Sequence, residues 1–372
     1  MDELLKIISR FAIKGEPVCA VPYGKGHINR TYKVTAQDDA GTYYYILQRI
    51  NDKVFLDVYG LMRNISRVSA HILTKLATQA LEGEKGLTII CTKQGTSYLK
   101  DVSGYYRVYD FISEGISIES AENLKQLELG GKGIGRFQRL LAGFDASLLQ
   151  ETIPNFHNTP QRYKDFCLAV DADIAGRKKN CQEVIDFFIS RAHYAPLITN
   201  ALQSGTIPSR VTHNDGKLNN VLIDPVNLKY VAVIDLDTVM PGASLYDLGD
   251  SVRFGASTGA EDEQDLSKVE FSLDAFAAIL KGYLAEVASM LTQGEQELLP
   301  IAGLLMTYEC GMRFLADYLN GDTYFAVHKE GHNLHRAKTQ MKLVADMEKK
   351  MQDIKAIVQN EMSANLVKAS YK

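Results

Sequence analysis

The run VTHNDGKLNN, from Val211 to Asn220, is almost wholly polar and lies between two more apolar segments. The segment after it, VLIDPVNLKYVAVIDLD, has the pattern of a β-hairpin and ends on two carboxylates, Asp235 and Asp237. A polar run on its own is typical of a surface turn. The combination His-x-Asp-x-Lys-x-x-Asn, followed by an apolar residue, Ile and Asp, is far more restrictive and favours a reaction site.

The residue types in this pattern suit the transfer of a phosphoryl group. Asp215 can accept a proton from a hydroxyl nucleophile, and Lys217 can offset charge on the phosphoryl group. Asn220 can bind a hard cation through its amide oxygen, and Asp235 would complete that metal site. Phosphoryl transfer needs mainly positioning and neutralised charge, which this set supplies. Asp237 would point the same way as Asp235 on a strand, so either a metal role or a local hydrogen bond is open to it.

The residues before this site indicate a small β-rich lobe. Short runs rich in Val, Ile, Tyr and Thr, punctuated by Gly, Asp, Lys and Gln, fill residues 17 to 111. One interruption, Val54 to Ala80, repeats apolar residues at spacings of three and four and predicts a helix. We therefore expect an antiparallel sheet with one helix inserted after its third strand.

Helical periodicity dominates after Phe111. The predicted helices cover Asn123 to Leu141, Tyr163 to Ala175, Glu183 to Leu202, Lys268 to Leu291, Gln296 to Leu319 and Ala337 to Ile357. A chain of 372 residues is too long for one ordinary core, so two lobes are expected. The predicted fold class is α+β: an N-terminal β lobe over residues 1–112 and a larger, mainly helical lobe over residues 113–372.

The composition excludes several classes of protein. A net charge of -4 lacks the basic excess of a nucleic-acid-binding protein. The five cysteines are an odd count without a C-x-x-C pair, which fits reduced thiols in the cytoplasm. The N-terminus MDELLKIISRF lacks the features of a signal peptide, and no apolar stretch approaches the roughly 20 residues that span a bilayer. We expect a cytoplasmic protein with no nucleic-acid or membrane partner.

The spacing within residues 213–220 resembles the catalytic and metal-binding loops of the protein-kinase-like fold. The continuation VIDLDTVMPGASLYDLGD is similar to the aminoglycoside phosphotransferase and choline kinase superfamily. Within that superfamily, YGKGHINRTYKV, YYILQRIN, RFQRLLAGFD and CGMRFLADYLNGDTYF most resemble the N-acetylhexosamine 1-kinases. The resemblance extends from about Ile13 to His335. It implies a bilobal kinase-like fold that uses ATP and Mg²⁺.

The resemblance also implies a role for each matching residue. Asp215 would be the catalytic base, and Asn220 and Asp235 would hold the Mg²⁺ that bridges the β- and γ-phosphates. Lys217 would lie near the transferred phosphoryl group, and His213 would buttress the loop.

The acceptor side rests on the segment CGMRFLADYLNGDTYF. In the resembling sugar kinases an Arg and a Tyr from this region contact the hexosamine, which carries over to Arg313 and Tyr324. A guanidinium can fork onto hydroxyls or an acetamide oxygen, and a tyrosine adds a hydroxyl or a flat apolar face. The alternative for Arg313 is a weak surface salt bridge with Asp317 one helical turn on. The acidic run at residues 260–265 is expected to be a solvated loop.

The segment YGKGHINRTY, between two predicted strands, is the candidate phosphate-covering loop. Gly24 and Gly26 permit close approach of the backbone to phosphates. The resemblance places Asn29 and Thr31 in the same loop, and His27 could reach phosphate or sugar hydroxyls.

The third strand, YYILQRI, departs from the protein-kinase pattern because it has no Lys. Gln48 takes that position, Arg49 is expected on the opposite face, and the sequence leaves open which of them contacts phosphate. The following helix also lacks the Glu that pairs with such a Lys. The backbone of Tyr109 to Ile112 would bind adenine. The glycine-rich Gly130 to Gly135 follows a helix-like segment, so we expect tight helix packing there rather than phosphate binding.

Three functions follow from these patterns. The leading hypothesis is an ATP-dependent kinase that phosphorylates the anomeric hydroxyl of an N-acetylhexosamine and yields the sugar 1-phosphate. The second is a kinase of the same superfamily for homoserine, choline or an aminoglycoside. The third is an inactive kinase-like binding module, against which the joint presence of Asp215, Asn220 and Asp235 argues.

Overall fold

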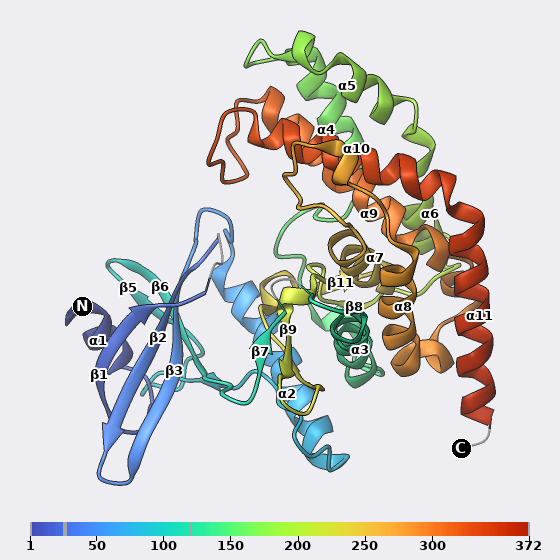
Figure 1. Ribbon diagram of the computed structural model, residues 1–372. Helices are drawn as coiled ribbons and strands as arrows, with labels where there is room; N and C mark the ends of the chain where they lie inside the picture. Colours follow the sequence, from blue (N-terminus) through green and yellow to red (C-terminus); the bar gives the residue numbers. More distant parts are fainter. Residues whose placement is uncertain (1, 25–27, 119–120, 371–372) are drawn as a thin grey trace.

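The computed structural model describes residues 2–24, 28–118 and 121–370. Its first part is an antiparallel sheet in the order β1-β2-β3-β6-β4, with β5 also paired to β6 (Figure 1). These strands are β1 (Glu16–Pro22), β2 (Arg30–Asp38), β3 (Gly41–Ile50), β4 (Ile89–Ile90), β5 (Leu99–Asp101) and β6 (Gly104–Asp110). The short helix α1 (Asp2–Ile8) packs against one face of this sheet in a small apolar cluster. The predicted antiparallel β lobe is confirmed.

Helix α2 (Val58–Thr78) follows the third strand as expected, but it is shorter than the predicted Val54 to Ala80. It begins after Asp57, whose side chain accepts a hydrogen bond from the backbone N–H of Gly60 and so caps the helix. The apolar stripe of α2 belongs to the same hydrophobic cluster as the helices of the larger lobe. Buried Asn64 strengthens that connection, because its side-chain amide donates to the backbone carbonyl of Val239 at 3.1 Å. The inserted helix therefore joins the sheet to the large lobe (Figure 1).

The larger lobe is mainly helical, as predicted. Its α-helices are α3 (Leu124–Leu140), α4 (Thr159–Ala172), α5 (Gln182–Ile189), α6 (Leu197–Gln203), α7 (Ser244–Gly255), α8 (Leu273–Val287), α9 (Gln293–Leu319), α10 (His332–Lys349) and α11 (Met351–Ser370). Two predicted helices are each divided. The segment Glu183 to Leu202 divides because α5 ends at Ile189 and a 3-10 turn, Ala192–Tyr194, precedes α6, whose N-cap is Pro196. The segment Ala337 to Ile357 breaks at Lys350.

Short strands in this lobe hold the loops of interest. After β6 the chain reaches β7 (Ile116–Ser117), which pairs with β9 (Val221–Asp224), and β9 pairs with β10 (Lys229–Val233). A second pair joins β8 (Arg210–Thr212) to β11 (Met240–Gly242). The polar run of residues 213–220 thus leaves β8 and enters β9. The division of the chain into two units at residue 112 stays a prediction.

The glycine-rich segment of α3 packs against α8, as the sequence predicts. A Cβ added at Gly131 would lie 2.1 Å from the carbonyl oxygen of Ile279, and one added at Gly282 would lie 1.9 Å from that of Glu128. Both neighbours are backbone atoms, so they cannot rotate away. The glycines therefore allow the two helices to approach each other closely.

Helix α9 runs through the core of the large lobe (Figure 1). By length and composition it could cross a membrane, contrary to the expectation that no stretch is long and apolar enough, and 72% of its apolar window is buried inside the fold. A core helix passes the same test, so this is weak evidence for a membrane span.

Candidate active site

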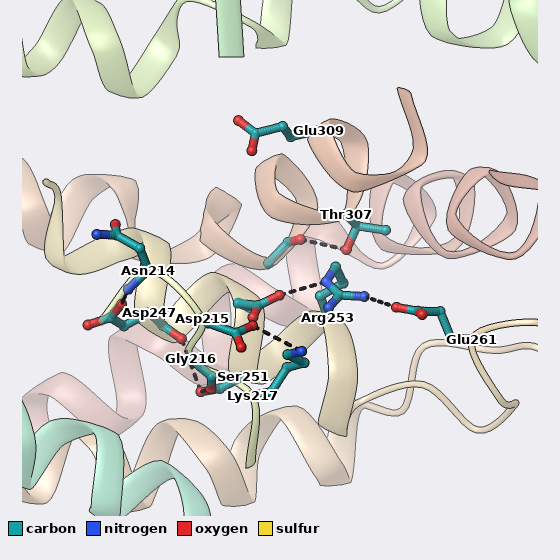
Figure 2. A network of polar contacts seen from close by, with 12 residues as sticks. Asn214, Asp215, Gly216, Lys217, Asp247, Ser251, Arg253, Glu261, Thr307 and Glu309 are labelled. Atoms are coloured by element: carbon teal, nitrogen blue, oxygen red, sulfur yellow. Dashed lines mark hydrogen bonds and ion pairs between the residues drawn. The ribbon is translucent and has the colours of Figure 1, made fainter. Parts of the chain in front are cut away.

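The candidate catalytic loop is the polar run of residues 213–220, and residues of helix α7 hold it in place. The buried carboxylate of Asp247 accepts from the backbone N–H of His213 at 3.0 Å and of Asn214 at 2.8 Å. A Cβ at Gly216 would lie 2.2 Å from the carbonyl oxygen of Asp247, so only glycine fits this approach. The hydroxyl of Ser251 donates to the carbonyl of Gly216 (Figure 2). Asp247 therefore braces the loop.

His213 connects this loop to the segment after β10. Its side chain is fully buried, and its Nε2 lies 2.8 Å from the carbonyl oxygen of Ile234, which fixes Nε2 as the protonated nitrogen. The carbonyl of His213 in turn accepts from the hydroxyl of Thr238. This arrangement agrees with a buttressing role, because His213 ties together the two segments that carry Asp215 and Asp235.

Asp215 lies at the centre of the loop, in contact with two partners that the sequence also singled out. Lys217 Nζ is 3.1 Å from Asp215 Oδ1 (Figure 2). The Asn220 amide donates to Asp215 Oδ2 at 3.2 Å. Burial raises the pKa of Asp215, but the nearby charges, led by Lys217, and the hydrogen bonds from Lys217 and Asn220 together outweigh burial and hold that pKa below its ordinary value. The Asp215 charge in turn raises the pKa of Lys217. Asp215 is thus an ionised carboxylate that keeps about a quarter of its surface open, 27% of its side chain, as a proton acceptor requires.

Asp235 and Asp237 do not lie on a strand, and this corrects the sequence-based expectation. Strand β10 ends at Val233, and Asp235 has a left-handed backbone at φ 61° before a 3-10 turn, Leu236–Thr238. The two carboxylates consequently have different surroundings: Asp235 is exposed, and Asp237 is buried. Asp237 accepts from the Asn29 amide at 2.5 Å, so its hydrogen bond reaches a distant segment and is not local.

The residues around Asp235 fit a divalent cation. Although Asp235 as a whole is exposed, desolvation by the protein around its carboxylate and the charges of Asp237 and Asp215 raise its pKa to about 6. A cation would offset this concentration of negative charge. The Asn220 amide nitrogen is occupied by Asp215, which leaves the amide oxygen as the ligand. Within the described ranges no group of three or more His, Cys, Asp or Glu side chains could hold a metal ion.

A second network of charges lies behind Lys217. The fully enclosed Arg253 guanidinium is 2.7 Å from Asp250 Oδ1 and 2.7 Å from Glu261 Oε1 (Figure 2). Asp262 pairs with Lys329 at 2.8 Å. The acidic run at residues 260–265 was expected to be a solvated loop, and its first acids are instead anchored to the large lobe.

The nucleotide side of the site is built from β2, β3 and β6. The Gln48 amide donates to the Thr31 hydroxyl at 3.0 Å, and Gln48 accepts from Nε of the buried Arg107 at 2.9 Å. Arg49 lies on the opposite face, in a shallow pocket of about 200 Å³ beside α1. Of the two residues left open by the sequence, Gln48 is therefore the one on the side of the catalytic loop.

The phosphate-covering loop is described only in part. Gly24 has a left-handed backbone at φ 76° with open space around it, and Asn29 contacts Asp237. The predicted contacts of Gly26 and His27 lie outside the described residues.

The acceptor side brings Arg313 and Tyr324 together. The Arg313 guanidinium is 5.3 Å from the ring centre of Phe156, 5.8 Å from Tyr324 and 5.6 Å from Phe325. Its Nη2 reaches the Tyr324 hydroxyl at 3.5 Å. Asp317 is not its partner, because that carboxylate accepts from the backbone N–H groups of residues 323–325. The salt bridge considered from the sequence is absent from the described contacts.

A buried histidine links this acceptor cluster to the catalytic loop. His157, next to Phe156, has Nε2 2.9 Å from the carbonyl oxygen of Asn214 and Nδ1 2.7 Å from Glu309 Oε1. Glu309 also accepts from the hydroxyl of Thr159 at 2.6 Å. Figure 2 shows Glu309, on α9, above the residues of this loop. His157 therefore connects Phe156 of the acceptor cluster to Asn214, the residue that precedes Asp215.

The chain is similar to known proteins in its sequence and in its fold. The sequence model of the phosphotransferase enzyme family, APH, matches residues 20–283. The fold is similar to an aminoglycoside phosphotransferase from Alicyclobacillus acidocaldarius subsp. acidocaldarius DSM 446, at 14% identity and TM-score 0.59, with 96% of each chain covered. A choline kinase from Cryptosporidium parvum Iowa II has 13% identity and TM-score 0.55, with 98% of each chain covered. A spectinomycin phosphotransferase solved with ADP and spectinomycin has 12% identity and TM-score 0.52, over 94% of this chain and 98% of that chain.

The two-lobed fold is that of kinase-like proteins. Because the family model covers well over half of the sequence, the chain belongs to the phosphotransferase enzyme family. The predicted superfamily and fold class are confirmed.

Proposed function

We propose that the protein is a cytoplasmic, ATP- and Mg²⁺-dependent kinase that phosphorylates the anomeric hydroxyl of an N-acetylhexosamine. The products are ADP and the sugar 1-phosphate. Membership of the phosphotransferase family supports transfer of a phosphoryl group to a small-molecule hydroxyl. The solved complex of the spectinomycin phosphotransferase contains ADP, which supports an adenine nucleotide as the donor here.

One observation supports a neutral sugar over a cationic acceptor: the acceptor cluster is positively charged. Arg313 lies among Phe156, Tyr324 and Phe325, and burial and the Arg313 charge lower the pKa of nearby Arg162. The carboxylate of Glu309 is already occupied by His157 and Thr159. Choline or an aminoglycoside would therefore meet like charge, whereas sugar hydroxyls and an acetamide oxygen would find a donor and flat rings.

The chain's own residues give the reaction its order. Asp215 accepts the proton of the anomeric hydroxyl while that oxygen forms a bond to the γ-phosphorus, and the bond from that phosphorus to the β-phosphate oxygen breaks. Lys217, 3.1 Å from Asp215, offsets charge on the phosphoryl group in transit. Asn220 and Asp235 would hold Mg²⁺, which supplies charge neutralisation on the β- and γ-phosphates.

An acceptor panel tests this function directly. ADP release would be measured with ATP and Mg²⁺ for N-acetylglucosamine, N-acetylgalactosamine, glucose, galactose, homoserine, choline and an aminoglycoside. The matched control is the methyl glycoside of whichever N-acetylhexosamine reacts, because it lacks a free anomeric hydroxyl. We expect turnover of the free sugar and none of the glycoside. Phosphorylation of the glycoside, or turnover only with choline, homoserine or the aminoglycoside, would overturn the proposal.

Replacing Arg313 should weaken acceptor binding more than catalysis. In Arg313→Met the apolar chain still packs among the rings, but the guanidinium donors are lost. We expect KM for the sugar to rise about 10- to 100-fold, in line with loss of a charged hydrogen bond, while KM for ATP changes little. Arg191→Met is the matched control, since Arg191 also stacks on an aromatic ring, that of Phe187, and pairs with Glu348. Equal effects in both variants would contradict the assignment.

A further inference from the structure

Arg107 is a buried charge that the reaction described above does not use. Its side chain is 1% exposed, and it lies on β6 directly opposite Gln48 of β3, so both side chains are on the same face of the sheet. An arginine is rarely so deeply buried unless it is paired. Its partner comes from the other lobe: Arg107 Nη1 is 2.5 Å from Oδ1 of Asp237, which is 6% exposed.

Both oxygens of the Asp237 carboxylate are held by residues of the small lobe. Arg107 takes Oδ1, and the Asn29 amide donates to Oδ2 at 2.5 Å. Arg107 is itself oriented by Gln48, which accepts from its Nε at 2.9 Å. The position where protein kinases place a Lys is therefore occupied by a neutral amide that orients an arginine from the neighbouring strand.

Arg107 is poorly placed to bind phosphate itself. It has almost no exposed surface, and two of its three nitrogens are in contact with Asp237 and Gln48. A nucleotide phosphate would have to displace that carboxylate to reach it. The contact that connects Arg107 to the segment carrying Asp235 is the one with Asp237.

Asp237 adjoins a strained backbone segment. Asp235 has a left-handed backbone at φ 61°, which residues other than glycine keep only when their surroundings enforce it. The residue before Asp235 is held by His213, whose Nε2 contacts the carbonyl of Ile234 at 2.8 Å. Two residues after Asp235, Arg107 holds Asp237. The segment that carries Asp235, the candidate metal ligand, is thus fixed on both sides: by His213 of the large lobe and by Arg107 of the small lobe.

We propose that Arg107 is a positioning residue: its ion pair with Asp237 spans the two lobes and holds the Asp235 carboxylate where it can bind the Mg²⁺ of the nucleotide. This inference rests on the proposed use of Mg²⁺ and ATP, and it does not depend on the identity of the acceptor. Arg107 on β6 thus takes the place of the Lys that protein kinases have on the third strand. It acts on the segment that carries Asp235 and not on phosphate.

The test measures binding of Mg²⁺ and ADP by calorimetry and needs no acceptor. In Arg107→Met we expect the Mg²⁺ concentration for half-saturation, at saturating ADP, to rise about 10- to 100-fold, the usual cost of removing a residue that orients a metal ligand. The affinity for ADP in EDTA should stay within about threefold, and Arg107→Lys should recover part of the Mg²⁺ affinity. Arg136→Met is the matched control, because Arg136 is a buried arginine that pairs with Glu84 at 2.6 Å.

A double variant separates positioning from stability. Arg107→Met with Asp237→Leu removes both buried charges, so it should recover thermal stability lost in the single variant. Its Mg²⁺ affinity should stay low, because the tie on Asp235 is still absent. The inference would be overturned if the double variant recovered Mg²⁺ affinity together with stability. It would also be overturned if Arg107→Met lost affinity for ADP in EDTA as much as it lost affinity for Mg²⁺. If the unaltered protein binds ADP no more tightly with Mg²⁺ than with EDTA, the proposed function fails first.

Discussion

Asp215→Asn is expected to lose about 10²- to 10⁴-fold in kcat while it still binds ADP with Mg²⁺. The asparagine has the same shape and can still contact Lys217 and Asn220, which lie 3.1 and 3.2 Å from the carboxylate oxygens. It cannot accept a proton from a hydroxyl. ADP release and calorimetric binding of ADP would separate the loss of chemistry from loss of the nucleotide site.

The matched control for this variant is Asp224→Asn. Asp224 is a carboxylate at the end of β9 that accepts from the backbone N–H of Val226 and Asn227 in a surface turn. We expect kcat to be unchanged there. Near-normal turnover in Asp215→Asn would rule out Asp215 as the base. Binding of ADP without turnover of any acceptor in the unaltered protein would favour the inactive binding module.

Gly282→Ala is expected to give the largest loss of stability among single methyl additions in the large lobe. The new Cβ would lie 1.9 Å from the carbonyl oxygen of Glu128 and 2.7 Å from the backbone nitrogen of Lys132. Helices α3 and α8 would have to move apart along their shared face. We expect a loss of more than about 3 kcal/mol in the free energy of unfolding, at or above the upper end for overpacked cores, measured by denaturant titration.

Lys281→Ala is the control for that measurement. It lies one residue earlier on α8, is exposed, and contacts only the side chain of Glu128 among its described partners, at 3.3 Å. Loss of such a surface pair should change the free energy of unfolding by less than about 1 kcal/mol. Similar unfolding midpoints for the two variants would contradict the close approach of α3 and α8.

Much of the catalytic loop was predictable because its chemistry is local in the sequence. Asp215, Lys217 and Asn220 fall within six positions, and a loop between two short strands keeps them together. The glycines of α3 were likewise predictable, since no strand precedes them. Periodicity also located most helices, but two of them are divided, one after Ile189 and one at Lys350.

The contacts that join distant segments could not be predicted in the same way. The pairing of Arg107 with Asp237 depends on how the two lobes meet, which no local pattern encodes. A charged residue inside the otherwise apolar and aromatic run GYYRVYD was the available signal. The strand assumed through Asp235 failed because a left-handed residue ends the extended backbone, and periodicity carries no information on φ. His157 and Glu309, 152 positions apart, gave no signal at all.

The carboxylate of Asp317 has a consequence for how the acceptor range of such an enzyme can change. It accepts hydrogen bonds from the backbone N–H groups of Thr323, Tyr324 and Phe325 and from the Asn333 amide. The loop over residues 323–325 is therefore held through its main chain. Side chains at these positions can then be replaced without losing the hydrogen bonds that hold the loop. In the proposed kinase, natural or laboratory selection could therefore change acceptor specificity by replacing Tyr324, without altering the residues proposed to carry out the reaction.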